Sequence, residues 1–161
     1  MKYFVIIRGP LGCGNSTIAK QLTQKINGEY IELDKVLDDN GLSSIPPGAE
    51  CIPVENFIKA NNIIIQQTTG IDVPLVLDGC FYHKEVIDDL INKMPVKGYV
   101  FTLKIPIDVC VERDSKREKS YGEDAARAVH SLVSRFDYGV DIYATKPPEE
   151  AIQEILSHLP S

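Results

Sequence analysis

Residues 9–17 read GPLGCGNST and come shortly after the apolar, strand-like run YFVII at positions 3–7. The segment follows the phosphate-binding pattern G-x-x-x-x-G-K-[ST]. In this pattern glycines let backbone N–H groups approach phosphate oxygens, a lysine reaches the β- and γ-phosphates, and a hydroxyl binds Mg²⁺. Gly9, Gly14 and Ser16 stand where the pattern needs them, Thr17 adds a second hydroxyl, and Asn15 takes the place of the lysine. The sequence predicts a phosphate-binding loop whose chemistry is altered at one position.

Composition and charge limit the classes of function. The chain has 161 residues, 43% hydrophobic and 25% charged, which predicts one globular domain over residues 1–161. A net charge of −6 argues against nucleic acid or an anionic membrane as a partner. We expect no membrane helix and no secretion signal. The four cysteines form no C-x-x-C pair, so we expect free thiols in a reducing cytoplasm.

Strand and helix patterns alternate along the whole chain. The strands are expected at residues 3–7, 30–33, 75–77, 99–103 and 140–143. The intervening segments carry apolar residues at helical spacing and are bounded by glycines and prolines. Strands separated by helices require parallel crossovers, so the pattern predicts an α/β protein with a doubly wound sheet.

Two aspartates follow predicted strands, at the sheet edge where ligands collect in open α/β folds. Asp34 follows the second strand, where a carboxylate would accept or orient the proton of a substrate hydroxyl. Asp78 ends the third strand, where a carboxylate holds Mg²⁺ through water in phosphate-loop proteins. Each residue is also a candidate N-cap or turn aspartate, and the sequence leaves both alternatives open.

Pro106 opens a predicted helix that runs into a charged stretch and ends near Gly122, and this stretch is a basic segment before Tyr121 and Gly122. It contains Arg113, Lys116, Arg117 and Lys119. A flap carrying arginines would close over a triphosphate and supply positive charge, with Arg113 and Arg117 the stronger candidates. The alternative is a solvated helix end, because acidic residues alternate with these basic ones.

Asn15 admits three interpretations. In the first, Asn15 is a single substitution in an otherwise active enzyme. In the second, the protein binds nucleotide without catalysing transfer. In the third, the protein is active because Arg8 or an arginine of the flap compensates for the missing lysine. A neutral amide cannot neutralise the charge on a transferring phosphoryl group, and losing one such donor costs roughly 10²–10³ in rate. We favour the first interpretation, because the other candidate residues resemble a catalytic set.

With these residues in place, the chain resembles small P-loop kinases of the nucleoside-monophosphate kinase class, in the branch of shikimate kinase, gluconate kinase and chloramphenicol phosphotransferase-like proteins. The resemblance rests on IIRGPLGCGNSTIAKQL, on Asp34, on LVLDG and on VCVERDSKR. It implies a P-loop NTPase fold with a five-stranded parallel sheet in the order 2-3-1-4-5 and a short lid. It also implies an acceptor site between Asp34 and the helix at 53–69, and an adenine pocket around residues 144–146.

The resemblance assigns roles by position. ATP and Mg²⁺ are the expected cofactors, with Ser16 and Asp78 at the metal and Thr17 at the α-phosphate. The expected nucleotide-binding residues are Gly9, Gly12, Cys13, Gly14, Asn15, Ser16 and Thr17, and the expected catalytic residues are Asp34, Asn15, Arg113 and Arg117. We therefore predict an ATP-dependent phosphotransferase that acts on a small-molecule acceptor. Two alternatives remain open: a non-catalytic nucleotide-binding or regulatory protein, and, less favoured by the acidic charge, a polynucleotide 5′-end kinase.

Overall fold

Five strands alternate with seven helices, as the hydrophobic pattern predicts. A computed structural model describes residues 1–161. The strands are β1 (Phe4–Arg8), β2 (Glu29–Glu32), β3 (Leu75–Gly79), β4 (Gly98–Lys104) and β5 (Val140–Tyr143). The helices are α1 (Asn15–Lys25), α2 (Leu33–Asp39), α3 (Val54–Thr68), α4 (Lys84–Lys93), α5 (Ile107–Ser115), α6 (Glu123–Val133) and α7 (Pro148–Ser157). None of these helices combines the length and the apolar character needed to cross a bilayer.

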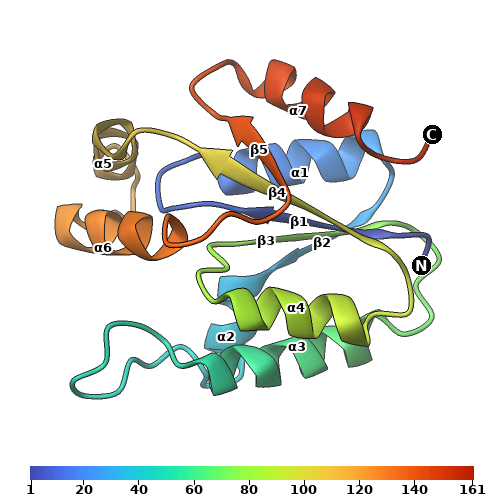
Figure 1. The fold of residues 1–161 in the computed structure, drawn as a ribbon, viewed down its shortest axis with the longest axis horizontal. Helices are drawn as coiled ribbons and strands as arrows, with labels where there is room; N and C mark the ends of the chain where they lie inside the picture. Colours follow the sequence, from blue (N-terminus) through green and yellow to red (C-terminus); the bar gives the residue numbers. More distant parts are fainter.

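All five strands are parallel and lie in the order β2-β3-β1-β4-β5, which confirms the predicted sheet. The chain leaves the central strand β1 through residues 9–14, at the edge where all the strands end (Figure 1). Ligands in open α/β sheets bind at this carboxyl edge. The topology thus puts the phosphate loop, residues 9–17, at the middle of the ligand-binding edge.

The sheet has an apolar core on each of its two faces, because successive side chains of a strand point to opposite faces. Val5 and Ile7 pack with α1 and α7, whereas Phe4 and Ile6 pack with α2, α3 and α4. Figure 1 shows these two helix layers, with α5 and α6 lying beyond the carboxyl edge. Both faces of β1 are buried, so the phosphate loop starts from a rigid support.

Three element boundaries differ from the prediction. The strand β2 ends at Glu32, so Asp34 lies in the first turn of α2 and not at a strand end. The strand β3 continues through Asp78 and Gly79, because β1 pairs with it as far as Gly79. The helix α5 ends at Ser115, where the prediction carried the helical segment to Gly122. The seven residues between α5 and α6, 116–122, are called the lid turn below.

Candidate functional site

A cavity of about 340 Å³ opens at the carboxyl edge of the sheet, over the phosphate loop. We call it the loop cavity. It is lined by Pro10, Leu11, Gly12, Cys13, Gly14, Asn15, Ser16, Thr17, Glu32, Asp34, Asp78, Gly79, Cys80, Arg113, Arg117 and Tyr121. Of the nucleotide-binding, metal-binding and catalytic residues assigned from the resemblance, all except Gly9 line it, whereas Lys116 and Lys119 of the basic segment do not. The structure thus brings together residues from seven separate segments around one space.

The backbone of the phosphate loop leaves N–H groups free to bind an anion. Gly12 and Gly14 have φ angles of 76° and 89°, a left-handed conformation that glycine adopts without strain. No side chain caps the start of α1 at Gly14. The first-turn amides of a helix have no intrahelical partner, and the helix dipole adds positive potential there. The loop therefore has the backbone features of a phosphate site.

Gly12 also lets helix α5 approach the loop. A Cβ at Gly12 would collide with the carbonyl oxygen of Cys110 and would lie 3.2 Å from the backbone nitrogen of Asp114. Only glycine leaves room for this backbone contact. The helix that leads into the lid turn is therefore seated directly on the phosphate loop.

Asn15 is engaged with protein groups at both ends of its amide. Its Nδ2 donates to the carbonyl of Gly79 at 3.0 Å, and its Oδ1 accepts from the thiol of Cys13. The Cys13 side chain is buried in the core, so only the backbone of that residue is available to a ligand, and burial raises the pKa of its thiol. Asn15 thus ties the phosphate loop to the end of β3 and adds no positive charge to the cavity.

Ser16 and Asp78 lie together beside the start of α1. The Ser16 hydroxyl donates to Asp78 Oδ2 at 2.8 Å, and the hydroxyl of Tyr30 donates to the same oxygen at 2.6 Å. Asp78 is only 2% exposed, and burial raises its pKa although both hydrogen bonds favour the charged form. The pair forms a hydroxyl–carboxylate arrangement that suits a hydrated Mg²⁺ ion.

Asp34 presents a second carboxylate to the cavity. Burial is the main cause that raises its pKa to about 6, and the negative charges of Asp78 and Glu32 add to the effect. Arg117 acts in the opposite direction. A carboxylate with a pKa near 6 exchanges a proton more readily at neutral pH than an exposed aspartate does.

Two arginines enter the cavity from the lid side. Arg113 Nη1 donates to the carbonyl of Ala144 at 3.3 Å, which connects α5 to the segment after β5. The guanidinium of Arg117 lies 5.3 Å from the centre of the Tyr121 ring, within the range of a cation–π contact. Both arginines line the loop cavity.

A buried aspartate shapes the lid turn that carries Arg117 and Tyr121. Asp114 is 1% exposed and accepts hydrogen bonds from the hydroxyl of Ser120 at 2.7 Å and from the amides of Tyr121 and Gly122. Burial opposes the charged form, but these hydrogen bonds lower the pKa of Asp114. No local motif in the sequence predicts this role of Asp114. Lys116 instead pairs with Glu112 at 3.0 Å on the surface, as the alternative interpretation expects for the lysines.

Several residues singled out from the sequence lie away from the loop cavity. Arg8 is fully buried and bonded to other protein groups, so it does not compensate for Asn15 at the phosphates. Two further arginines, Arg127 in α6 and Arg135 just after it, also form ion pairs outside the cavity, with Glu123 and Glu50 respectively. No residue of α3 lines the cavity, so the expected helix face does not contribute to it. Glu32, Cys80 and Tyr121 line it without having been predicted.

Two curated relatives are shikimate kinases. That of Mannheimia succiniciproducens is 30% identical over 131 residues, which cover 78% of this chain and 72% of the relative. That of Marinomonas sp. strain MWYL1 is 29% identical over 101 residues, which cover 60% of this chain and 55% of the relative. The chain thus spans between about half and three quarters of the length of these relatives. No family model matches the chain.

A solved structure with the same fold is an unliganded sugar kinase from Janibacter sp. HTCC2649. It superposes with a TM-score of 0.78 over 98% of this chain and 94% of that chain, at 18% sequence identity. At this identity the likeness shows the fold alone.

Proposed function

This chain belongs to the small P-loop kinases, the family that contains shikimate kinase, and from that premise we propose that it transfers the γ-phosphoryl group of ATP to a hydroxyl of a small-molecule acceptor. The observation that carries the proposal is the loop cavity itself. It combines free amides of the phosphate loop, a hydroxyl–carboxylate pair, a carboxylate with a raised pKa and two arginines. Residues 1–161 would act as one domain.

The phosphate loop would hold the triphosphate. Backbone amides from Gly12 to Thr17 would donate to the phosphate oxygens, and the α1 dipole would favour their charge. Asn15 would contribute through its backbone only, because its side chain is engaged with Gly79 and Cys13. Arg113 and Arg117 would supply the positive charge that a lysine provides elsewhere in such loops.

Ser16 and Asp78 would hold the metal. No three His, Cys, Asp or Glu side chains gather into a metal site. This suits Mg²⁺, which in phosphate-transfer sites keeps several waters and is held by few protein groups plus substrate phosphates. Ser16 would bind the ion through its hydroxyl, and Asp78 would hold a coordinated water. When bound, Mg²⁺ would neutralise charge on the phosphate oxygens.

Asp34 would act on the acceptor. The acceptor oxygen forms a bond to the γ-phosphorus, the bond from that phosphorus to the β–γ bridging oxygen breaks, and ADP leaves. The hydroxyl proton passes to the Asp34 carboxylate as the new bond forms. Its pKa of about 6 keeps most of it ionised at pH 7 while leaving it basic enough to take the proton. Transfer is direct and in line, without a covalent enzyme intermediate.

A second function, a nucleotide-binding protein without catalysis, is favoured by one observation. The Asn15 amide is satisfied by Gly79 and Cys13, so the altered position is part of the folded loop and leaves no polar gap. In this alternative the loop would bind ATP, and closure of the lid turn would be the only response.

The experiment compares the natural chain with Asn15→Lys, and uses Asn92→Lys on exposed surface as the charge-matched control. ATP binding is measured by calorimetry with Mg²⁺, and transfer is followed as ADP release with sugars, sugar acids and cyclic alcohols. We expect ATP binding in all three forms and a transfer rate roughly 10²–10³ higher in Asn15→Lys. ATP binding without transfer in any form supports the second function. Absence of ATP binding in every form refutes both.

A further inference from the structure

Arg8 ends β1 immediately before the phosphate loop, and it is fully buried. Its guanidinium donates three hydrogen bonds, with Nε to the carbonyl of Phe81 at 3.2 Å, Nη1 to Thr102 Oγ1 at 3.0 Å and Nη2 to the carbonyl of Val133 at 3.0 Å. These acceptors belong to the turn after β3, to β4 and to the end of α6. One side chain thus joins three segments that are far apart in the sequence.

The charge of Arg8 is buried without a carboxylate partner in ion-pair contact. Burial lowers its pKa to about 10, so it stays protonated at neutral pH. The ring of Phe136 lies 4.4 Å from the guanidinium carbon, and the Val133 carbonyl belongs to the negative end of the α6 dipole. Burying a cation in this way is costly. An apolar side chain would serve packing alone at lower cost.

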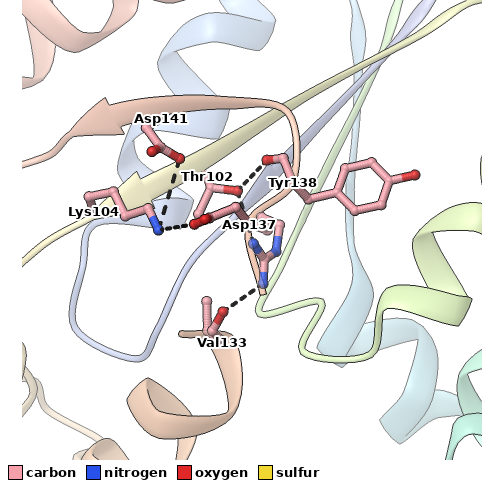
Figure 2. Close-up of polar contacts among 7 residues, drawn as sticks. Thr102, Lys104, Val133, Asp137, Tyr138 and Asp141 are labelled. Atoms are coloured by element: carbon pink, nitrogen blue, oxygen red, sulfur yellow. Dashed lines mark hydrogen bonds and ion pairs between the residues drawn. The ribbon is translucent and has the colours of Figure 1, made fainter. Parts of the chain in front are cut away.

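The two carboxylates whose charges act on Arg8, Asp137 and Asp141, are held by another residue. Lys104 Nζ lies 3.0 Å from Asp137 and 3.9 Å from Asp141, and Figure 2 shows both contacts beside Thr102. Arg8 therefore meets only neutral acceptors. Its planar donor set suits several carbonyls in fixed directions, which a lysine ammonium cannot match.

The hydrogen bonds of Arg8 continue into the segment after α6. Thr102 Oγ1 accepts from Arg8 and donates to the carbonyl of Tyr138 at 2.7 Å (Figure 2). Residues 133–138 are thus held at both ends, at Val133 and at Tyr138. The opposite end of α6 begins directly after the lid turn. Arg8 therefore connects the start of the phosphate loop to the C-terminal end of α6, the helix that follows the lid turn.

The bond to Phe81 fixes a second wall of the loop cavity. Phe81 has a φ of 46°, a left-handed conformation that a bulky residue adopts only when its surroundings hold it. The preceding residues Gly79 and Cys80 line the cavity, and Gly79 accepts the Asn15 amide. Arg8, immediately before the phosphate loop, and Asn15, within it, therefore hold the same turn.

We infer that Arg8 is a positioning residue that fastens the β3–α4 turn and the C-terminal end of α6 to the start of the phosphate loop, and so passes nucleotide binding on to α6, the helix that follows the lid turn. The second statement, that nucleotide binding acts through Arg8, is the transmission part and rests on the proposed binding of nucleotide at the loop. The fastening part depends on the fold alone, so the two parts can be tested separately.

Hydrogen exchange of backbone amides, with and without Mg²⁺ and a non-hydrolysable ATP analogue, tests both parts. The variants are Arg8→Met, Thr102→Val and Arg8→Lys. Thr68→Val is the matched control, because Thr68 is a buried threonine in α3 that bonds only to its own helix. Losing one hydrogen bond of about 1 kcal/mol raises local opening about fivefold.

Without nucleotide, we expect exchange to rise at least about fivefold at residues 80–82 and 133–138 together in Arg8→Met, and at 133–138 in Thr102→Val. With nucleotide, the natural chain should show slower exchange in both residues 9–17 and residues 123–138. Arg8→Met should keep the effect at 9–17 and lose it at 123–138. Arg8→Lys should not restore it, because one ammonium cannot reach three acceptors.

Calorimetry on the same samples separates the two proposals. Absence of nucleotide binding in the natural chain refutes the proposed function, and the exchange rates without nucleotide still test the fastening. If Arg8→Met does not fold, Thr102→Val decides. The inference is overturned if amide exchange at residues 133–138 in the deciding variant equals that of the natural chain. It is also overturned if the increase in exchange is spread evenly over α3 and the sheet.

Discussion

Replacing Asp34 by asparagine should make the protein more stable at neutral pH while it removes the proposed proton acceptor. The folded protein raises the pKa of Asp34 from its ordinary value of 3.8 to about 6, mainly through burial. Between these two pH values the folded chain binds more protons than the unfolded chain, so ionisation of Asp34 lowers stability as pH rises. Above pH 6 the cost is constant, at about 3 kcal/mol. Below about pH 4 both states are protonated and the cost disappears.

Part of this gain is offset by a local interaction. Asp34 lies in the first turn of α2, where a negative charge gains about 0.3–1 kcal/mol from the helix dipole. The net gain for Asp34→Asn at pH 7.5 is therefore about 2 kcal/mol, or roughly 4–8 °C in Tm for a chain of this size. At pH 4 the two proteins should unfold at nearly the same temperature.

The assay is thermal and urea unfolding at pH 4 and pH 7.5, with Asp38→Asn as the control. Asp38 lies on the same helix but is exposed, so its replacement should change stability little at either pH. A gain of equal size at both pH values would mean that the amide packs better than the carboxyl, whatever its charge. No gain at pH 7.5 would mean that the cavity does not penalise the Asp34 charge. Either result refutes the reasoning.

Three further predictions concern the loop and the lid. Gly12→Ala should lower the free energy of unfolding in urea by about 1–3 kcal/mol, because its Cβ would meet the Cys110 carbonyl and its φ is left-handed. Gly41→Ala is the control: Gly41 has a similar φ but open space around it, so the loss of free energy should be smaller. Asp114→Ala should weaken ATP binding about tenfold in calorimetry, because charge-assisted hydrogen bonds of about 1.5–3 kcal/mol hold the lid turn. The same variant should be cleaved faster by a protease within residues 116–122. Ser16→Ala should bind ATP equally well with Mg²⁺ and with a chelator, and a persistent Mg²⁺ effect would contradict its proposed role as a metal ligand.

The strand order could be predicted because the signals for it are local. Apolar runs, glycines and prolines mark each element, and the phosphate loop identifies the central strand. The end of β2 was misplaced because Leu33 is apolar and continues the strand pattern, whereas in the structure it is the first buried residue of α2. A single apolar residue at a junction fits both periodicities, so packing decides between them.

The loop residues of the candidate site could be predicted from their spacing, but the residues that complete the cavity could not. Tyr30 reaches Asp78 across 48 positions of sequence, and Asp114 folds a turn whose residues carry no common motif. Such contacts depend on side-chain placement and leave no periodic signal. Glu32 is an exception, because parallel register sets it opposite Asp78, and an accurate end for β2 would have revealed it.

In the proposed function, the balance of charge in the loop cavity would make the lid turn matter more here than in a loop that contains lysine. Three carboxylates, Glu32, Asp34 and Asp78, face the space, and the cations are Arg113 and Arg117. A lysine inside the loop would be in place whatever the lid does. Both arginines instead belong to α5 and the lid turn, so their position over the phosphates depends on how that unit is seated. Stable nucleotide binding and correct seating of the lid are therefore expected to be one coupled event, and its strength should fall when Mg²⁺ is removed or when salt screens the two arginines.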